Sequence, residues 1–244
     1  MPILTPPPTA IPTSTSTSTR FDLPLHIDAA IVDLDGTLVD TVGDFEAALA
    51  RMLGERGRPP IDRTVLSQMV GKGSEHLVQL ALAHAGLPAA DAPAALARYL
   101  HHYADVNGRH SQLFPGVRQG LEALRARGLP LICLTNKPAG FARDLLRVLD
   151  LDRYFGTVFG GDSFARKKPD PLPVLESCRA LGTAPARTLM LGDSRNDAQA
   201  ARTAGCPVVL VTYGYNHGQP VRQVDADGFV DALGEVAALL APPA

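Results

Sequence analysis

The chain has 244 residues, of which 45% are hydrophobic, and its formal net charge at pH 7 is only −2. This length can bury one large core, or a core with a smaller appended domain. The near-neutral charge gives no electrostatic support for a nucleic-acid or membrane partner, and no apolar run approaches the roughly 18 residues that a membrane span requires.

Residues 1–24 are predicted to form a disordered Pro/Ser/Thr-rich tail. Thr5 to Thr19 is almost entirely Pro, Ser, Thr and Ala, so it has too little apolar surface to offset the entropy lost on ordering. The tail lacks the apolar stretch of a secretory signal. The three cysteines show neither CxxC nor zinc spacing and are expected to be reduced thiols. We therefore expect a cytoplasmic location.

A short buried strand over residues 28–34 runs into two acids, Asp33 and Asp35. The carboxyl ends of parallel strands border the ligand crevice, and a spacing of two places both side chains on one side of the strand. Gly36 can adopt a backbone conformation closed to other residues, and Thr37 adds a hydroxyl and an amide donor. The run therefore offers a nucleophile, an acid/base and a phosphate cradle. It is not an EF-hand, which needs a third Asp or Asn before its glycine.

Helical periodicity replaces the strand pattern after Asp40 and continues to about residue 114. Breaks fall at 57–60, at Gly71-Lys72-Gly73 and at 86–88. We therefore predict an all-helical cap over residues 41–114, inserted into a core formed by residues 25–40 and 115–244. Because the insert follows the first strand directly, it is expected to cover the crevice as a lid.

Strands and helices alternate after the insert. The predicted helices cover residues 117–127, 139–149, 172–181 and 198–204, and the predicted strands cover residues 129–134, 157–159, 188–191 and 208–211. Such alternation indicates an α/β fold with a Rossmann-like parallel sheet and helices on both faces.

Two of the later loops carry polar groups where a strand ends or a helix starts. Thr135 and Asn136 end a buried strand, although many strands end in Thr-Asn simply to begin a turn. Lys168 precedes Pro169, which biases the lysine toward an extended conformation near the start of a helix. The alternative for the Lys167-Lys168 pair is a solvated loop.

A further acidic run, Gly192-Asp193-Ser194-Arg195-Asn196-Asp197, follows the predicted strand over residues 188–191. Asp193 is expected at the same crevice edge as Asp33, and Asp197 lies one helical turn farther on the same side. A helix N-cap with an acidic first turn explains either acid singly. It does not explain why the chain has four such polar runs, at residues 33–37, 135–136, 168–169 and 192–197. The seven histidines show no metal-ligand spacing.

The four runs resemble, in order, the signatures of the haloacid-dehalogenase-like phosphatases. The resemblance implies that Asp33 attacks phosphorus and forms an aspartyl phosphate, while Asp35 protonates the leaving alkoxide and then activates water. It assigns phosphoryl contacts to the residues that follow the strands and to the lysine, namely Gly36, Thr37, Thr135, the Asn136 backbone amide and Lys168. Dehalogenases and phosphonatases of this group lack an acid at the Asp35 position.

The resemblance also implies a Mg²⁺ cofactor, since magnesium prefers oxygen ligands. The expected ligands are the Asp33 and Asp193 carboxylates and the Asp35 backbone carbonyl, with Asp197 acting through water.

In residues 103–108, 113–117 and 212–216, and over residues 27–240 as a whole, the chain looks most similar to bacterial phosphoglycolate phosphatases. This resemblance implies 2-phosphoglycolate as a small-molecule substrate. The loop Gly71-Lys72-Gly73 is then expected to meet the substrate, with Lys72 a departure from the uncharged residue common there. The alternative for Lys72 is a solvated loop lysine. The alternatives are a phosphatase or phosphomutase of the same superfamily acting on another ester, and a receiver-like phosphoacceptor module. Neither a nucleic-acid nor a membrane partner is expected, and the sequence does not reveal the oligomeric state.

Overall fold

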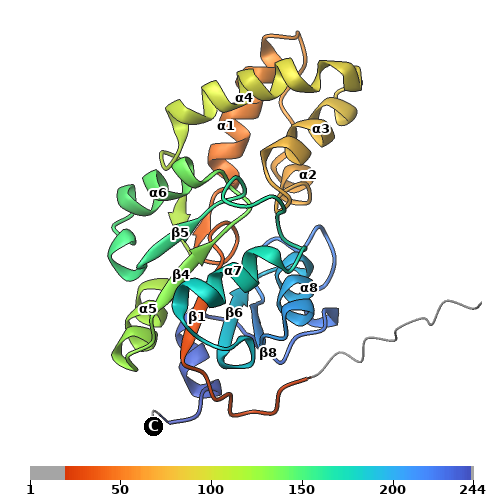
Figure 1. The fold of residues 1–244 in the computed structure, drawn as a ribbon. Coiled ribbons are helices and arrows are strands. Elements are labelled where there is room, and N and C mark those ends of the chain that lie inside the picture. Colours follow the sequence, from red (N-terminus) through yellow and green to blue (C-terminus); the bar gives the residue numbers. More distant parts are fainter. Residues whose placement is uncertain (1–19, 243–244) are drawn as a thin grey trace, which may run out of the picture.

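The computed structural model describes residues 20–242, which form a sheet-based core and a helical cap above it (Figure 1). The core contains a six-stranded parallel sheet in the order β5-β4-β1-β6-β7-β8. Its strands are β1 (Ala29–Val32), β4 (Leu131–Leu134), β5 (Thr157–Phe159), β6 (Thr188–Gly192), β7 (Val208–Val211) and β8 (Gly228–Val230). The predicted fold class is confirmed.

Helices cover both faces of the sheet (Figure 1). Ala30 and Val32 of β1 pack toward α5 (Val117–Ala126) and α6 (Ala139–Val148), whereas Ile31 packs toward α7 (Leu172–Leu181) and α8 (Arg195–Ala204). All four residues of β1 are fully buried. This two-sided burial explains why the strand is continuously apolar in sequence. Short 3-10 helices complete the core: η2 (Asp152–Tyr154), η3 (Pro185–Arg187), η4 (Val221–Gln223) and η5 (Leu233–Leu239).

The cap consists of α1 (Val42–Gly54), α2 (Arg63–Ser67), α3 (Ser74–His84), η1 (Ala89–Asp91) and α4 (Ala92–Val106). It has its own apolar core, in which Leu49, Met52 and Leu82 pack against Tyr99 and Tyr103. Helices thus lie between residues 42 and 106 of the predicted cap, whereas residues 112–113 form a strand and not part of an all-helical segment. No helix within residues 20–242 combines the length and apolarity that crossing a membrane requires.

The two chain segments that connect cap and core run side by side, which the sequence did not predict. Strand β2 (Val39–Asp40) pairs antiparallel with β3 (Gln112–Leu113). Asp44, at the start of α1, is fully buried and accepts hydrogen bonds from the second connection. Its donors are the backbone N–H groups of Gly108 and His110, both at 2.7 Å, and the Ser111 hydroxyl. One carboxylate therefore fixes both connections.

Replacing Asp44 with alanine is expected to lower the free energy of unfolding by about 3 kcal/mol, because buried donors lose a charged acceptor. This loss corresponds to a fall in melting temperature of roughly 6–12 °C for a chain of this size. Circular dichroism melts will measure it. Asp105→Ala is the matched control, since Asp105 forms an exposed ion pair with Arg51, and its effect is expected to stay below about 1 kcal/mol. Equal effects at the two positions would contradict the role of Asp44.

Element boundaries differ from the sequence prediction where local caps or long-range contacts decide them. Helix α8 begins at Arg195 rather than near residue 198, because Ser194 and Asp197 form a capping box there.

The predicted tail boundary is wrong for residues 20–24. Arg20 forms an ion pair with Asp225, and the Phe21 N–H donates to Asp227 at 2.8 Å, so this part docks on the core. Residues 1–19 lie outside the described part of the chain.

Candidate active site

Three neighbouring strands of the sheet end in polar residues at one edge of the core. Asp33 directly follows β1, Thr135 follows β4 and Asp193 follows β6. Because β4, β1 and β6 are adjacent and parallel, these three ends meet below the cap (Figure 1). The expectation that Asp33 and Asp193 share one crevice edge therefore agrees with the structure.

Lys168 is buried among the acids of this edge. Its ammonium nitrogen lies 3.0 Å from Asp33 Oδ1 and 2.7 Å from Asp197 Oδ1, and it donates to the Leu134 carbonyl at 2.8 Å. Although burial opposes the charged form, the Asp197 and Asp33 carboxylates raise the pKa of Lys168. The lysine is therefore charged and is held against the expected nucleophile.

The Asn136 side chain holds the Lys168 backbone, a role that the sequence did not indicate. Its Oδ1 accepts from the Lys168 N–H at 3.0 Å, and its Nδ2 donates to the Lys168 carbonyl at 2.9 Å. The same Nδ2 donates to the Gly71 carbonyl of the cap at 2.9 Å. Asn136 thus ties the lysine loop and the cap loop to the end of β4.

Asp33, Asp193 and Asp197 form a buried acidic triad, with one carboxylate oxygen of each within 4.8 Å of the others. Burial raises the pKa of Asp33 to about 7, with Lys168 opposing and Asp197 and Asp35 adding to the shift. Burial and the Asp197 charge also raise the pKa of Asp193 well above its ordinary value. When all three acids are ionised, one ammonium against three carboxylates leaves two negative charges, which a divalent cation would neutralise.

The three acids differ in how many of their oxygens are free for a cation. Asp197 accepts hydrogen bonds at Oδ2 from the Ser194 hydroxyl and the Ser194 and Asp193 N–H groups, and its Oδ1 binds Lys168. Asp33 Oδ1 is buried and lies 3.0 Å from Lys168 Nζ, but within the described residues it accepts no hydrogen bond of good geometry. Asp33 therefore has coordination capacity left, whereas Asp197 is better placed to orient its neighbours.

Gly36 and Thr37 lie against Asp193. A Cβ on Gly36, whose φ is +86°, would lie 2.0 Å from Asp193 Oδ2, so only glycine fits there. The Thr37 side chain is fully buried, and its hydroxyl lies 3.5 Å from Asp193 Oδ1. In this arrangement the hydroxyl faces Asp193. The Tyr215 N–H donates to Asp193 Oδ2 at 2.5 Å and its hydroxyl donates to Asp40 in the connection to the cap, contacts that the sequence did not predict.

A pocket opens between this edge and the cap. It is lined from the core by Asp33, Asp35, Thr135, Asn136 and Lys137, and from the cap by Phe45, Val70, Gly71, Gly73, Ser74, Leu77, Tyr99 and Tyr103. The cap loop thus reaches the site through Gly71 and Gly73, whose φ values of +116° and +88° favour glycine. Lys72, between them, is exposed and is absent from the pocket lining. The Lys167 ammonium, 2.6 Å from Glu75, links core and cap at the surface.

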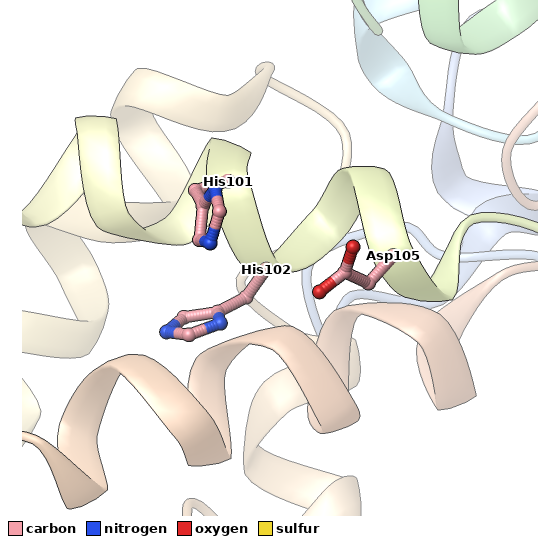
Figure 2. Close-up of side chains that lie close together, drawn as sticks. All are labelled: His101, His102 and Asp105. Carbon is pink, nitrogen blue, oxygen red and sulfur yellow. The ribbon is translucent and has the colours of Figure 1, made fainter.

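A second group of possible metal ligands lies on α4 in the cap. His101, His102 and Asp105 project from this helix with ligand atoms within 4.8 Å of one another, although their sequence spacing gave no such indication (Figure 2). His102 points toward α1 and contacts Glu55 at 2.7 Å, and Asp105 pairs with Arg51. These pairings between helices account for His102 and Asp105, and none of the three residues lines the pocket.

Comparisons with known proteins agree with this geometry. The family model described as haloacid dehalogenase-like hydrolase matches residues 27–205. Phosphoglycolate phosphatase from Thiobacillus denitrificans is 43% identical over 221 residues, covering 89% of this chain and 97% of its own. A plasmid-encoded phosphoglycolate phosphatase from Cupriavidus necator is 43% identical, covering 89% and 95%.

Among solved structures, that of a predicted phosphoglycolate phosphatase from Haemophilus somnus superimposes with a TM-score of 0.81 at 31% identity. It covers 87% of this chain and 97% of its own. The match to the family model extends over the strand ends that carry Asp33, Thr135 and Asp193 and over Lys168. The chain therefore belongs to the haloacid dehalogenase-like hydrolases.

Proposed function

We propose that this hydrolase is a magnesium-dependent phosphatase that converts 2-phosphoglycolate to glycolate and phosphate. The observation that carries the proposal is the pair of carboxylates, Asp33 and Asp35, which line one pocket closed by the cap. Relatives that are 43% identical over nearly their whole length and named for this activity support the choice of substrate. The buried free cysteines support a cytoplasmic location.

The proposed reaction uses the two acids in succession. Asp33 attacks phosphorus, the bond from phosphorus to the ester oxygen breaks, and Asp35 gives its proton to the departing alkoxide. In the second step Asp35 takes a proton from water, which attacks phosphorus and releases Asp33 with inorganic phosphate. The Lys168 ammonium contacts the Asp33 carboxylate and offsets the repulsion between this carboxylate and the anionic phosphoryl group. The Thr135 hydroxyl and the Asn136 backbone amide are proposed to bind phosphoryl oxygens.

The acidic triad fits a magnesium ion, because it presents hard oxygen donors with an uncompensated double negative charge. We propose Asp33, Asp193 and the Asp35 carbonyl as its ligands, with Asp197 acting through water. When bound, the ion would neutralise charge on the phosphoryl group and on the triad. Gly36 leaves room for Asp193 beside the phosphate-binding turn, and Thr37 orients that acid.

Turnover on a panel of esters tests the substrate assignment. Phosphate release from 2-phosphoglycolate in the presence of Mg²⁺ is expected to exceed that from hexose phosphates in kcat/KM by at least about tenfold. Interconversion of hexose phosphates without phosphate release would instead identify a phosphomutase. A stable phosphoprotein that releases no phosphate would identify a receiver-like module.

Magnesium is expected to stabilise the folded protein, since it binds only where the acids are assembled. At a concentration of about one hundred times Kd the gain is about 2.7 kcal/mol, or roughly 5–10 °C in melting temperature. The pKa of Asp33 is raised to about 7, so the metal-free protein loses stability as pH rises from about 4 through 7. Because Mg²⁺ binds the ionised carboxylate, the gain in stability on adding Mg²⁺ is expected to be larger at pH 8 than at pH 6.

Melts with Mg²⁺ and with EDTA will measure this gain, with Asp193→Asn as the comparison. Asp193→Asn is expected to melt at or above the wild-type temperature in EDTA, because one repelling carboxylate is gone. It is also expected to lose the magnesium-dependent shift. A full shift in Asp193→Asn would contradict the ligand assignment.

A further inference from the structure

We propose that Lys137 recognises the carboxylate of 2-phosphoglycolate and sets the substrate preference of the pocket. This inference rests on the proposed function and names the residue that selects its substrate. The sequence pointed instead to Lys72, whose side chain is exposed and absent from the pocket lining. Among the described residues that line the pocket, Lys137 is the only one with a basic side chain.

The Lys137 ammonium lies where the core meets the cap. Its side chain is only 3% exposed, and its Nζ lies 2.9 Å from Asp35 Oδ1. It donates to the Tyr103 hydroxyl at 2.9 Å and lies 4.5 Å from the centroid of the Phe45 ring. Both aromatic residues belong to cap helices, so the charge is fixed between the expected acid and the lid.

The ammonium keeps capacity for a ligand. A lysine has three N–H donors and no acceptor. Within the described residues, Tyr103 and Asp35 are its polar partners, which leaves one donor for a group that enters the pocket. Lys168 is not comparably free, because its ammonium already contacts Asp33, Asp197 and the Leu134 carbonyl.

The chemistry of the substrate places its carboxylate near Lys137. A single CH₂ group separates the ester oxygen of 2-phosphoglycolate from its carboxylate carbon. Asp35 must contact that ester oxygen to protonate it, so the carboxylate lies within a few ångströms of Asp35. The Lys137 Nζ is in that range. The cap side of the pocket is mainly apolar or aromatic, including Phe45, Val70 and Leu77, so a carboxylate without this partner would be buried at high cost.

A thermodynamic cycle on enzyme and substrate tests the assignment. The protein change is Lys137→Gln, and the substrate change replaces the carboxylate of 2-phosphoglycolate with a carboxamide of the same shape. We expect Lys137→Gln to lower kcat/KM for 2-phosphoglycolate by about ten- to a hundredfold more than for the amide, which corresponds to about 1.4–2.8 kcal/mol of coupling. A residue that only positions Asp35 or supports the cap would lower both values equally.

Lys72→Gln is the matched comparison, at the other lysine that the sequence offers for this role. Its cycle with the same two esters is expected to show less than about twofold coupling. Coupling at Lys72 and none at Lys137 would overturn the inference. Circular dichroism melts will verify folding, and Lys137→Met, whose unbranched chain keeps the packing on Phe45 and Tyr103, takes the place of the Gln variant if that variant does not fold.

The wild-type enzyme separates failure of the inference from failure of the proposed function. Absence of phosphate release from 2-phosphoglycolate by wild-type protein with Mg²⁺ would overturn the proposed function and the Lys137 assignment together. Release by the wild type, with equal losses on both esters in the Lys137 variant, would overturn the Lys137 assignment alone.

Discussion

Replacing Asp33 with asparagine is expected to reduce kcat by roughly four orders of magnitude or more, as expected for loss of a nucleophile. The neutral amide cannot form the acyl phosphate on which both steps depend. The fold should be unaffected, since asparagine has the same shape and removes one carboxylate from the buried triad. Phosphate release and thermal melting in EDTA measure the two effects. Recovery of more than a few per cent of wild-type activity would exclude the covalent mechanism.

Asp35→Asn is the informative counterpart to this variant. With p-nitrophenyl phosphate, whose leaving group needs little protonation, the first step should survive while the second is slowed. We expect a burst of about one p-nitrophenolate per enzyme followed by slow turnover. Asp33→Asn should show no burst. A burst in Asp33→Asn would contradict the role of Asp33 as the nucleophile. Slow turnover without a burst in Asp35→Asn would contradict the role of Asp35 in the second step.

Replacing Lys168 with methionine is expected to have the largest combined effect on stability and activity. The change leaves the Asp33 and Asp197 carboxylates buried without their cation, and removing one partner of a buried ion pair costs about 3–5 kcal/mol. Turnover should fall by at least about a hundredfold, because the nucleophile and the phosphoryl group then repel each other. Urea unfolding and phosphate release will measure the two losses.

Two further variants test whether the loss of stability in Lys168→Met comes from its buried ion pairs. Adding Asp197→Asn to Lys168→Met returns the net charge of the cluster to its wild-type value, and it should restore much of the stability but not the activity. Lys167→Met, at a partly exposed ion pair with Glu75, should change stability by less than about 1 kcal/mol. Equal destabilisation by the two lysine variants would show that burial of the Lys168 pair is not the cause.

The polar residues at the edge of the sheet were predictable because each one lies directly after a strand that can be recognised from the local sequence. Asp33, Thr135 and Asp193 each follow an apolar run, and parallel strands place such residues together whatever the connecting segments do. The strands that escaped prediction are short: β2 and β3 have two residues each, and β8 has three. Runs of two residues are too short to show alternation, although β5, which has three residues like β8, was predicted.

The contacts between cap and core were not predictable from local pattern. Lys137 meets Tyr103 across 34 positions of sequence, and the Asn136 side chain meets Gly71 across 65. These contacts depend on how two independently packed units dock, which no periodicity encodes. The family resemblance predicted that Lys72 meets the substrate, with a solvated loop lysine as the alternative. The direction of a side chain between two glycines of positive φ is not set by helix or strand geometry, and here it is exposed.

The pairing of β2 with β3 means that the chain leaves the core and returns to it at one place. A different folded unit could occupy residues 41–114 if its two ends lay about 5 Å apart, the spacing of neighbouring strands. Asp33, Asp35, Lys168 and Asp193 are all encoded outside that segment. Exchange of one contiguous stretch of gene could therefore give such an enzyme a new lid while its reactive groups stay unchanged, a direct route for descendants to acquire new substrates.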